Sequence, residues 1–126
     1  MAVALVVVQL RAQLTQAQHR QVHGSHTALG LVYITDHYAE HGQALLDMLR
    51  RDLPDVLRWV GTVGIGVVAT GVEYMDEPAL SVMLCDLPPD QVEVFSGLSP
   101  LAASGTSSWG WSASSALLHA DGAAPE

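Results

Sequence analysis

The chain has 126 residues, the length of one domain, and 49% of them are hydrophobic whereas only 14% are charged, a composition that excludes a disordered chain. Its 13 acidic and 5 basic residues give a formal net charge of −8, which argues against binding to nucleic acid or to an anionic membrane surface, because both need clustered Lys and Arg. The single cysteine, Cys85, excludes a disulfide framework and a four-cysteine metal site, and it indicates a reducing compartment.

The sequence contains no apolar run of the roughly 18 residues that a membrane span needs. Its apolar start, Ala2 to Leu10, lacks the basic region and the cleavage site of a signal peptide. We therefore expect a cytoplasmic protein. The small share of charged residues leaves a thin polar coat, which suggests that another domain or a partner covers part of the surface.

The first half of the chain predicts a helix, a strand and a second helix. Apolar residues recur at three- and four-residue spacings from about Val3 to Gln21, which is typical of a helix, and residues 22–27 read as a loop. Leu29 to Thr35 is a continuous apolar run between turn residues, as in a strand covered on both faces. After Asp36, an apolar stripe predicts a helix over Tyr38 to Arg51.

The second half predicts further strands. Val56 to Val60 leads into a second strand, and the strand–helix–strand order implies a parallel pair with a right-handed crossover. Four glycines within Gly61 to Gly71 indicate a strand end and a loop in which backbones approach closely. Strands are expected at Ala79 to Leu84 and Gln91 to Phe95, with a turn at residues 88–90 between them that favours antiparallel pairing.

These elements predict the α/β class, with a mixed sheet that starts as β-α-β and continues with antiparallel strands. Residues 1–98 are expected to form the α/β domain. Residues 99–126 read as a linker rich in Ser, Gly and Ala, followed by the start of a truncated further strand unit, with a short strand at Ser115 to His119.

One motif matches a metal-site pattern. His37, Glu40 and His41 form H-x-x-E-H, the inverted zinc-peptidase motif, in which two histidines on one helix face share a zinc ion and the glutamate acts as general base. The motif needs a third protein ligand, and none of Glu73, Glu77 and Glu93 is favoured for that role. The competing interpretation is an exposed polar helix start.

Other patterns are weaker. Gly64, Gly66 and Ala69 fit the loose dinucleotide-binding fingerprint, but this fingerprint must open a helix and the residues that follow do not begin one. A close approach of two backbones is the simpler interpretation. Cys85 ends an apolar strand and is interpreted as a structural thiol. Three early histidines are interpreted as part of a solvated segment rather than as a metal cluster: His19, His23 and His26.

Several segments together resemble a known family. Residues 31–39, Leu-Val-Tyr-Ile-Thr-Asp-His-Tyr-Ala, resemble the first strand and helix start of FIST domains, named for F-box and intracellular signal transduction proteins. Residues 59–83 resemble the family's glycine-rich strand and the acidic turn that follows it, and residues 116–121 resemble the strand that opens its next unit. The main resemblance covers about residues 28–96. Because FIST proteins are usually several times longer, we expect a truncated N-terminal part that lacks some strands of the sheet.

The resemblance implies a sensory module that binds a small ligand, such as an amino acid, and acts in signal transduction. It implies no catalytic residue, and we expect neither a metal nor a cofactor. The partners to be expected are the small ligand, a downstream signalling protein or the remaining FIST regions, and a second copy of the chain, but neither nucleic acid nor a membrane.

The binding site is inferred from the physics of the sheet. Ligands of α/β sheets bind at the carboxyl ends of parallel strands, where glycine N–H groups could hold a carboxylate and Asp36 an amine. An equally good interpretation is that the glycines only permit tight packing. The residues at the two strand ends are Thr35, Asp36, His37, Gly61, Thr62, Gly64 and Gly66.

Two alternative functions stay open at this level. The first is a zinc-dependent hydrolase that uses the motif at residues 37–41. The second is a structural fragment without independent function, which is stable only together with the rest of its chain or as an oligomer.

Overall fold

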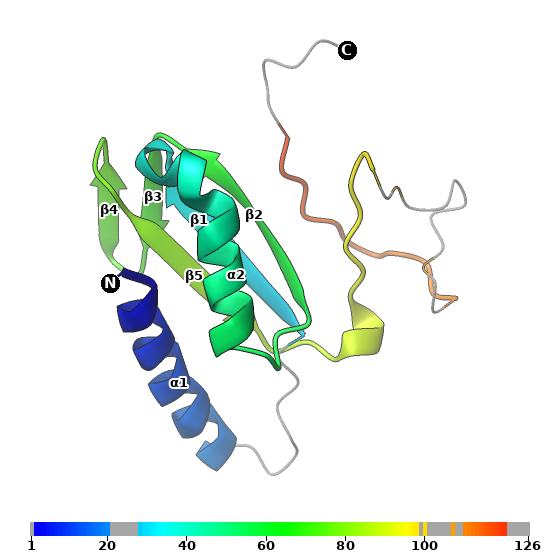
Figure 1. Ribbon diagram of the computed structural model, residues 1–126. Coiled ribbons are helices and arrows are strands. Elements are labelled where there is room, and N and C mark those ends of the chain that lie inside the picture. Colours follow the sequence, from blue (N-terminus) through cyan, green and yellow to red (C-terminus); the bar gives the residue numbers. More distant parts are fainter. Residues whose placement is uncertain (1, 21–27, 99, 101–106, 108–109, 121–126) are drawn as a thin grey trace. The chain divides into compact units, whose positions relative to one another are not determined.

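The computed structural model describes residues 2–20, 28–98, 100, 107 and 110–120. These residues fall into two units, 1–92 and 93–126. The first unit contains all the helices and strands shown as ribbons in Figure 1. The predicted loop at residues 22–27 lies outside the described residues.

The main sheet has three strands in the order β2-β1-β5. Strand β1 (Leu29–Thr35) pairs in parallel with β2 (Arg58–Gly64) and antiparallel with β5 (Leu80–Cys85). The crossover between β1 and β2 contains a 3₁₀ helix (Asp36–His41) and α2 (Gly42–Asp52). The predicted α/β class, with its β-α-β start and its mixed sheet, is therefore confirmed.

A separate hairpin follows β2. Strands β3 (Gly66–Ala69) and β4 (Val72–Met75) pair antiparallel with each other in a second, two-stranded sheet. Gly71 has a φ of 75°, a left-handed conformation that glycine adopts without strain in a tight turn. The glycine-rich segment was predicted as a strand end and a loop, and it instead continues β2 to Gly64 and then forms this hairpin.

Two helices form the core against one face of the main sheet. Helix α1 (Ala2–Arg20) agrees with the helix predicted from apolar spacing. Its Val3, Val7 and Leu10 pack with α2 and the residues after it, and the apolar side chains of β5 close the cluster. In Figure 1, α1 lies beside β5, whereas α2 crosses in front of β1 and β2. The buried core residues are Val3, Val7, Leu10, Leu49, Leu53 and Val56.

The helix predicted for Tyr38 to Arg51 differs at its start. Regular α-helix begins only at Gly42, and the preceding six residues form the 3₁₀ helix. Thr35 makes no capping hydrogen bond from its side chain at the start of the 3₁₀ helix, because its hydroxyl bonds elsewhere. Helix α2 ends at Asp52, two residues before Pro54, with Arg50 and Arg51 in its last turn, where their positive charge complements the helix dipole.

Two predicted strands are wrong. Gln91 belongs to a short 3₁₀ helix (Pro89–Gln91), and residues 92–96 are not in a strand. Residues 115–119 are irregular as well. A short apolar run becomes a strand only where a neighbouring strand bonds to it, and the sequence pattern of the run does not reveal that neighbour. In the second unit, the N–H of Gly110 donates to the carbonyl oxygen of Ser107 (3.0 Å).

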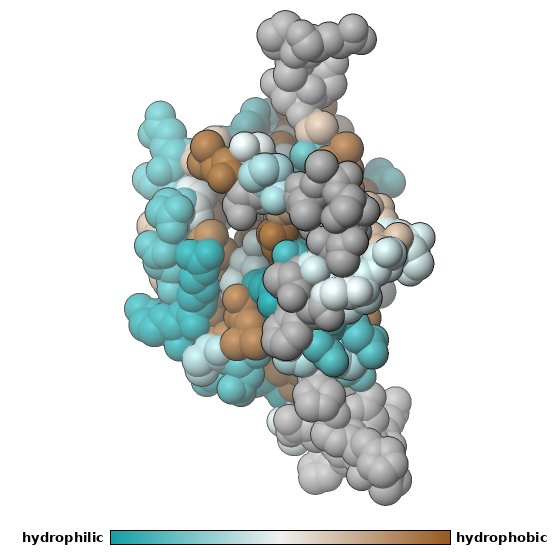
Figure 2. Space-filling view, turned by 90° about the vertical axis from the view of Figure 1, so that its right-hand side faces the viewer, coloured by the Kyte–Doolittle hydropathy of each residue, from teal (hydrophilic) through white to brown (hydrophobic). Residues whose placement is uncertain are grey.

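The surface carries many apolar side chains, as the thin polar coat suggested. Figure 2 shows hydrophobic residues in separate patches between hydrophilic ones on one face of the molecule. Ile65 and Val68 are among the most exposed, with 73% and 69% of their surface accessible. In the part of the chain that the structure describes, no helix is long and apolar enough to cross a membrane.

Candidate functional site

The carboxyl ends of β1 and β2 lie at the same edge of the main sheet. Thr35 is the register partner of Gly64, so the chain leaves both strands side by side. Asp36 follows directly after Thr35, and Gly66 follows one residue beyond the end of β2. Gly61 and Thr62 lie further back in β2, opposite Val32 and Tyr33. We call this edge, with Thr35, Asp36 and His37 on one strand end and Gly64 on the other, the strand-tip site.

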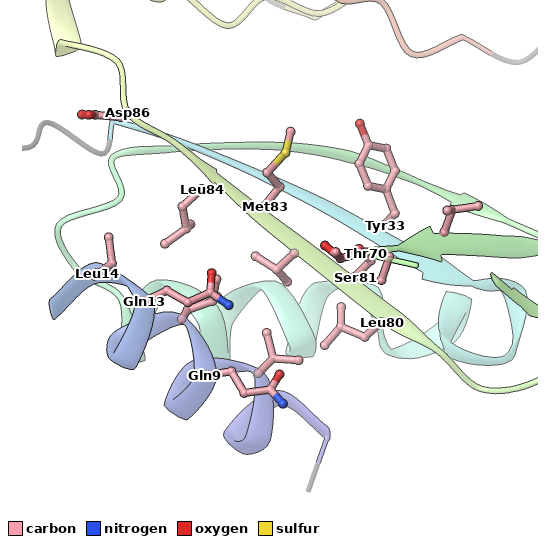
Figure 3. Close-up of a pocket in the computed structure, with 15 residues that line it drawn as sticks. Gln9, Gln13, Leu14, Tyr33, Thr70, Leu80, Ser81, Met83, Leu84 and Asp86 are labelled. Carbon is pink, nitrogen blue, oxygen red and sulfur yellow. The ribbon is translucent and has the colours of Figure 1, made fainter. Parts of the chain in front are cut away.

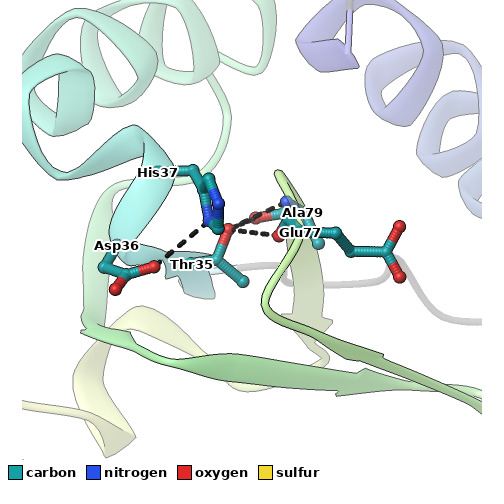
Figure 4. A network of polar contacts seen from close by, with 5 residues as sticks. All are labelled: Thr35, Asp36, His37, Glu77 and Ala79. Atoms are coloured by element: carbon teal, nitrogen blue, oxygen red, sulfur yellow. Dashed lines mark hydrogen bonds and ion pairs between the residues drawn. The ribbon is translucent and has the colours of Figure 1, made fainter.

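Thr35 is fully buried, and its hydroxyl is engaged within the protein. The Thr35 Oγ1 atom accepts a hydrogen bond from the N–H of Ala79 (2.9 Å) and donates one to the carbonyl oxygen of Glu77 (2.8 Å). The backbone N–H of Thr35 also donates to the carbonyl oxygen of Ala79 (3.0 Å). This hydrogen-bond network, drawn in Figure 4, links the β4–β5 connection to the end of β1.

Asp36 and His37 form the exposed part of the strand-tip site. The Nδ1 atom of His37 lies 3.2 Å from Oδ1 of Asp36, and the two side chains are 36% and 59% accessible, respectively. Figure 4 shows the imidazole and the carboxylate facing each other at the start of the 3₁₀ helix. This pair therefore offers a ligand one carboxylate and one imidazole at the surface.

Two of the glycines are explained by close packing. A β-carbon on Gly61 would collide with the carbonyl oxygen of Val32 in the neighbouring strand, and one on Gly66 would collide with the sulfur atom of Met75. At Gly64 the nearest such atom, the carbonyl oxygen of Gly66, is 3.2 Å away. Thr62 is exposed, and its hydroxyl donates to the carbonyl oxygen of Val63 (3.3 Å).

The H-x-x-E-H motif does not place its histidines on one helix face. His37 and His41 both lie in the 3₁₀ helix, which has three residues per turn, so side chains four positions apart leave it about 120° apart. The zinc-peptidase pattern needs both imidazoles on the same face of an α-helix. Among the described residues, no group of three His, Cys, Asp or Glu side chains is arranged to hold a metal ion.

The dinucleotide fingerprint also lacks its structural setting. Gly66 to Ala69 is strand β3, whereas the fingerprint requires a helix that begins at the glycines. Of the early histidines, His23 and His26 lie outside the described residues, as does the side chain of His19.

A groove along β5 is a concave feature away from the strand-tip site, and the sequence did not predict it. It has a volume of about 610 Å³, and helix α1, strand β5 and the end of β3 form its walls. Figure 3 shows Gln9 and Gln13 of α1 below β5, with Tyr33 and Met83 on the opposite face of the sheet. The lining residues are Val6, Gln9, Leu10, Gln13, Leu14, Tyr33, Val68, Ala69, Thr70, Leu80, Ser81, Val82, Met83, Leu84 and Asp86.

The sequence contained one signal that could have drawn attention to this groove. In α1, amide and apolar side chains alternate along one stripe. Gln9 and Gln13 belong to this stripe, and because they are four residues apart they share a face of the helix. The second wall, strand β5, is however brought to α1 by tertiary contacts from more than 60 residues further along the chain.

At the end of β5, burial raises the pKa of the Cys85 thiol above its ordinary value.

Comparison with known proteins identifies a family. The family model of the FIST N domain matches residues 28–126, beyond the segment of the sequence resemblance, and leaves α1 outside. A search of curated proteins finds no significant match, and a search of solved structures finds none either. Because the match covers most of the chain, the protein belongs to the FIST N domain family, which is associated with signal transduction and is not a known enzyme family.

Proposed function

We propose that this chain is a small-ligand sensing module and that it binds a zwitterionic ligand, such as a free amino acid, at the strand-tip site. One observation supports the proposal above the others. The ends of two parallel strands meet in register at Thr35 and Gly64, and the exposed Asp36–His37 pair stands directly beside them. Carboxyl ends of parallel strands are the usual ligand position in α/β sheets.

The chemistry of the pair suits a ligand with two charges. The carboxylate of Asp36 would hold an ammonium group, and the imidazole of His37 would donate to a carboxylate. Thr35 would act as a positioning residue, because its hydroxyl network fixes the backbone from which Asp36 and His37 project. Gly64 would shape the floor of the site, whereas Gly61 and Thr62 lie further back in β2 and Gly66 packs against Met75 in the hairpin.

A thermal-shift series with single amino acids tests this function. Binding to the native state alone stabilises the protein by about 2.7 kcal/mol when the ligand is at a hundred times its Kd, which corresponds to an increase in Tm of several degrees. Asp36→Asn should abolish the increase for the amino acid that produces it. If no amino acid changes the Tm at millimolar concentration, the proposal fails.

A matched control separates a binding effect from a general charge effect. Asp55 is exposed and precedes β2, so it lies toward the opposite end of the parallel pair. Asp55→Asn removes the same charge and should leave the ligand-dependent increase in Tm unchanged. A loss of the increase in both variants would show that only the net charge matters.

The wider setting belongs to the same proposal. We expect the module to work in the cytoplasm and to pass ligand occupancy to a signalling protein or to other FIST regions, without nucleic acid and without a membrane. Zinc-dependent hydrolysis is not favoured as a second function, because the 3₁₀ geometry separates His37 from His41.

A further inference from the structure

In the part of the chain that the structure describes, strand β5 lies at the edge of the main sheet, and its outer side faces the groove. The order β2-β1-β5 leaves β5 paired only with β1 among the described residues. The hydrogen bond from the N–H of Thr35 to the carbonyl oxygen of Ala79 shows which residues of this antiparallel ladder bond inward. In an antiparallel ladder the backbone N–H and C=O groups of alternate residues point away from the paired strand. In β5 these are the backbone groups of Leu80, Val82 and Leu84, which point towards the groove. Such an edge is a template for one more strand.

Helix α1 forms a wall over the place where that strand would lie. The side chains of Leu80, Val82 and Leu84 pack on the same face of the sheet as the core formed by α1 and α2. An added strand would therefore place every second side chain against α1 and the others beside Ser81 and Met83. The volume of about 610 Å³ is in the usual range of ligand-binding pockets.

The lining of the groove restricts what could occupy it. Although the chain carries a net charge of −8, Asp86 is the only charged residue among the described residues that line the groove. The remaining polar groups are neutral, and they include the carboxamides of Gln9 and Gln13, which can both donate to and accept from peptide groups. A segment that complements this lining is largely apolar and carries one basic group, at the end that lies near Asp86.

A second copy of the chain fits this edge poorly. If β5 paired with β5 of another copy, the two strands would be about 4.8 Å apart. The α1 helices, which flank the outer edge of β5 in each copy, need about 8–10 Å between their axes. Helix α1 therefore leaves room for one added strand but prevents the β5 strands of two copies from pairing symmetrically.

We propose that the groove binds an extended peptide segment of a partner protein, which adds to β5 as an antiparallel strand. The segment alternates apolar side chains, which face α1, with small polar ones, and it carries a basic residue at its amino-terminal end beside Asp86. Backbone hydrogen bonds to Leu80, Val82 and Leu84 hold it, as in other cases of strand addition. This site is separate from the strand-tip site, and it depends on α1, which the family match does not include.

The test uses the full chain and a capped hexapeptide that consists of one lysine followed by alternating valine and threonine. In the proposed register the valines lie opposite Leu84, Val82 and Leu80, and the lysine lies beside Asp86. We expect saturable binding by calorimetry. In an NMR hydrogen-exchange experiment, the amides of Leu80, Val82 and Leu84 should exchange more slowly when the peptide is present.

Methylation of the peptide backbone separates strand addition from unspecific adsorption. The valine N–H groups point towards β5 in this register, whereas the threonine N–H groups point away. N-methylation of the valines should weaken binding by about tenfold or more, because it removes donors to β5. N-methylation of the threonines should have little effect. Equal affinities of the two methylated peptides would overturn the proposal.

The acidic end of the groove has its own variant. Asp86→Asn should weaken binding of the lysine peptide by about threefold, relative to the effect of the same substitution on binding of a norleucine peptide. This is the size expected for an exposed charge pair. Asp55→Asn, which removes an acid outside the groove, should not do so. The proposal is wrong if the lysine peptide does not bind at millimolar concentration, or if free amino acids protect the same three amides. It is also wrong if those amides are protected by a concentration-dependent dimer without peptide.

Discussion

The indole ring of Trp59 lies directly against Gly30, its register partner across the parallel pair β1–β2. A β-carbon on residue 30 would come within 2.5 Å of the ring atom Cζ3 and 2.6 Å of Cε3. Glycine is therefore required here because the ring takes the space of a side chain, and not because of its backbone conformation. This contact joins the two strands whose ends form the strand-tip site.

Gly30→Ala should destabilise the fold by about 1–3 kcal/mol, the usual cost of inserting a methyl group into a packed interior. Urea denaturation measures the change in the free energy of unfolding. Gly97→Ala is the control, because a β-carbon at Gly97 meets no atom within 4 Å; it should change the stability by less than about 0.5 kcal/mol. A Gly30→Ala variant as stable as the original protein would contradict the packing of Trp59 against this residue.

Thr35→Val should cost about 1–3 kcal/mol, because it leaves the N–H of Ala79 and the carbonyl oxygen of Glu77 without their buried partner. Valine has nearly the shape of threonine, so the loss reports the hydroxyl. Thr35→Ser keeps the hydroxyl and should retain the network at the cost of one methyl group. Denaturation of the two variants side by side distinguishes these contributions, and equal losses would argue against a hydroxyl network.

Arg11→Ala should loosen α1 from the rest of the first unit. The Nη2 atom of Arg11 donates to the carbonyl oxygen of Asp52 (2.6 Å) and so ties α1 to the last residue of α2. A bond of this kind at an exposed position is worth about 1 kcal/mol. Hydrogen exchange should therefore become faster in α1. Arg50→Ala, whose partner Asp47 is 4.0 Å away, serves as the control and should leave α1 unchanged.

The Cys85 thiol should react slowly and should make stability fall at high pH. Burial raises the pKa of this thiol in the folded state, so the folded protein keeps the proton to higher pH than the unfolded chain does. The free energy of unfolding is then unaffected below the ordinary thiol pKa, and it decreases as the pH rises through that pKa towards the folded one. Alkylation rates with iodoacetamide at increasing pH should be lower for the folded protein than for the chain in urea.

A Cys85→Ser variant provides the reference for stability. Its free energy of unfolding should lack the decrease that the thiol produces above the ordinary thiol pKa. Equal alkylation rates in the folded and unfolded chains would show that Cys85 is no less accessible than a free thiol.

The sequence alone determined the parts of this protein that local patterns control. The apolar run Leu29 to Thr35 predicted β1 with its actual bounds, because a strand buried in a sheet leaves an uninterrupted apolar signature. The three- and four-residue spacing predicted α1, and the strand–helix–strand order predicted the parallel pair. It follows from this order that Asp36 and Gly64 belong to the same edge of the sheet.

Tertiary structure decided the rest, because contacts between distant segments have no local pattern. The hydroxyl of Thr35 bonds to the β4–β5 connection 42 residues away and therefore does not cap the helix that follows β1. That helix starts as a 3₁₀ helix rather than as an α-helix. The side-chain spaces at Gly30, Gly61 and Gly66 are filled by Trp59, Val32 and Met75, which only strand pairing brings there. The groove along β5 likewise exists because α1 packs beside an edge strand, so that its walls come from opposite ends of the first unit.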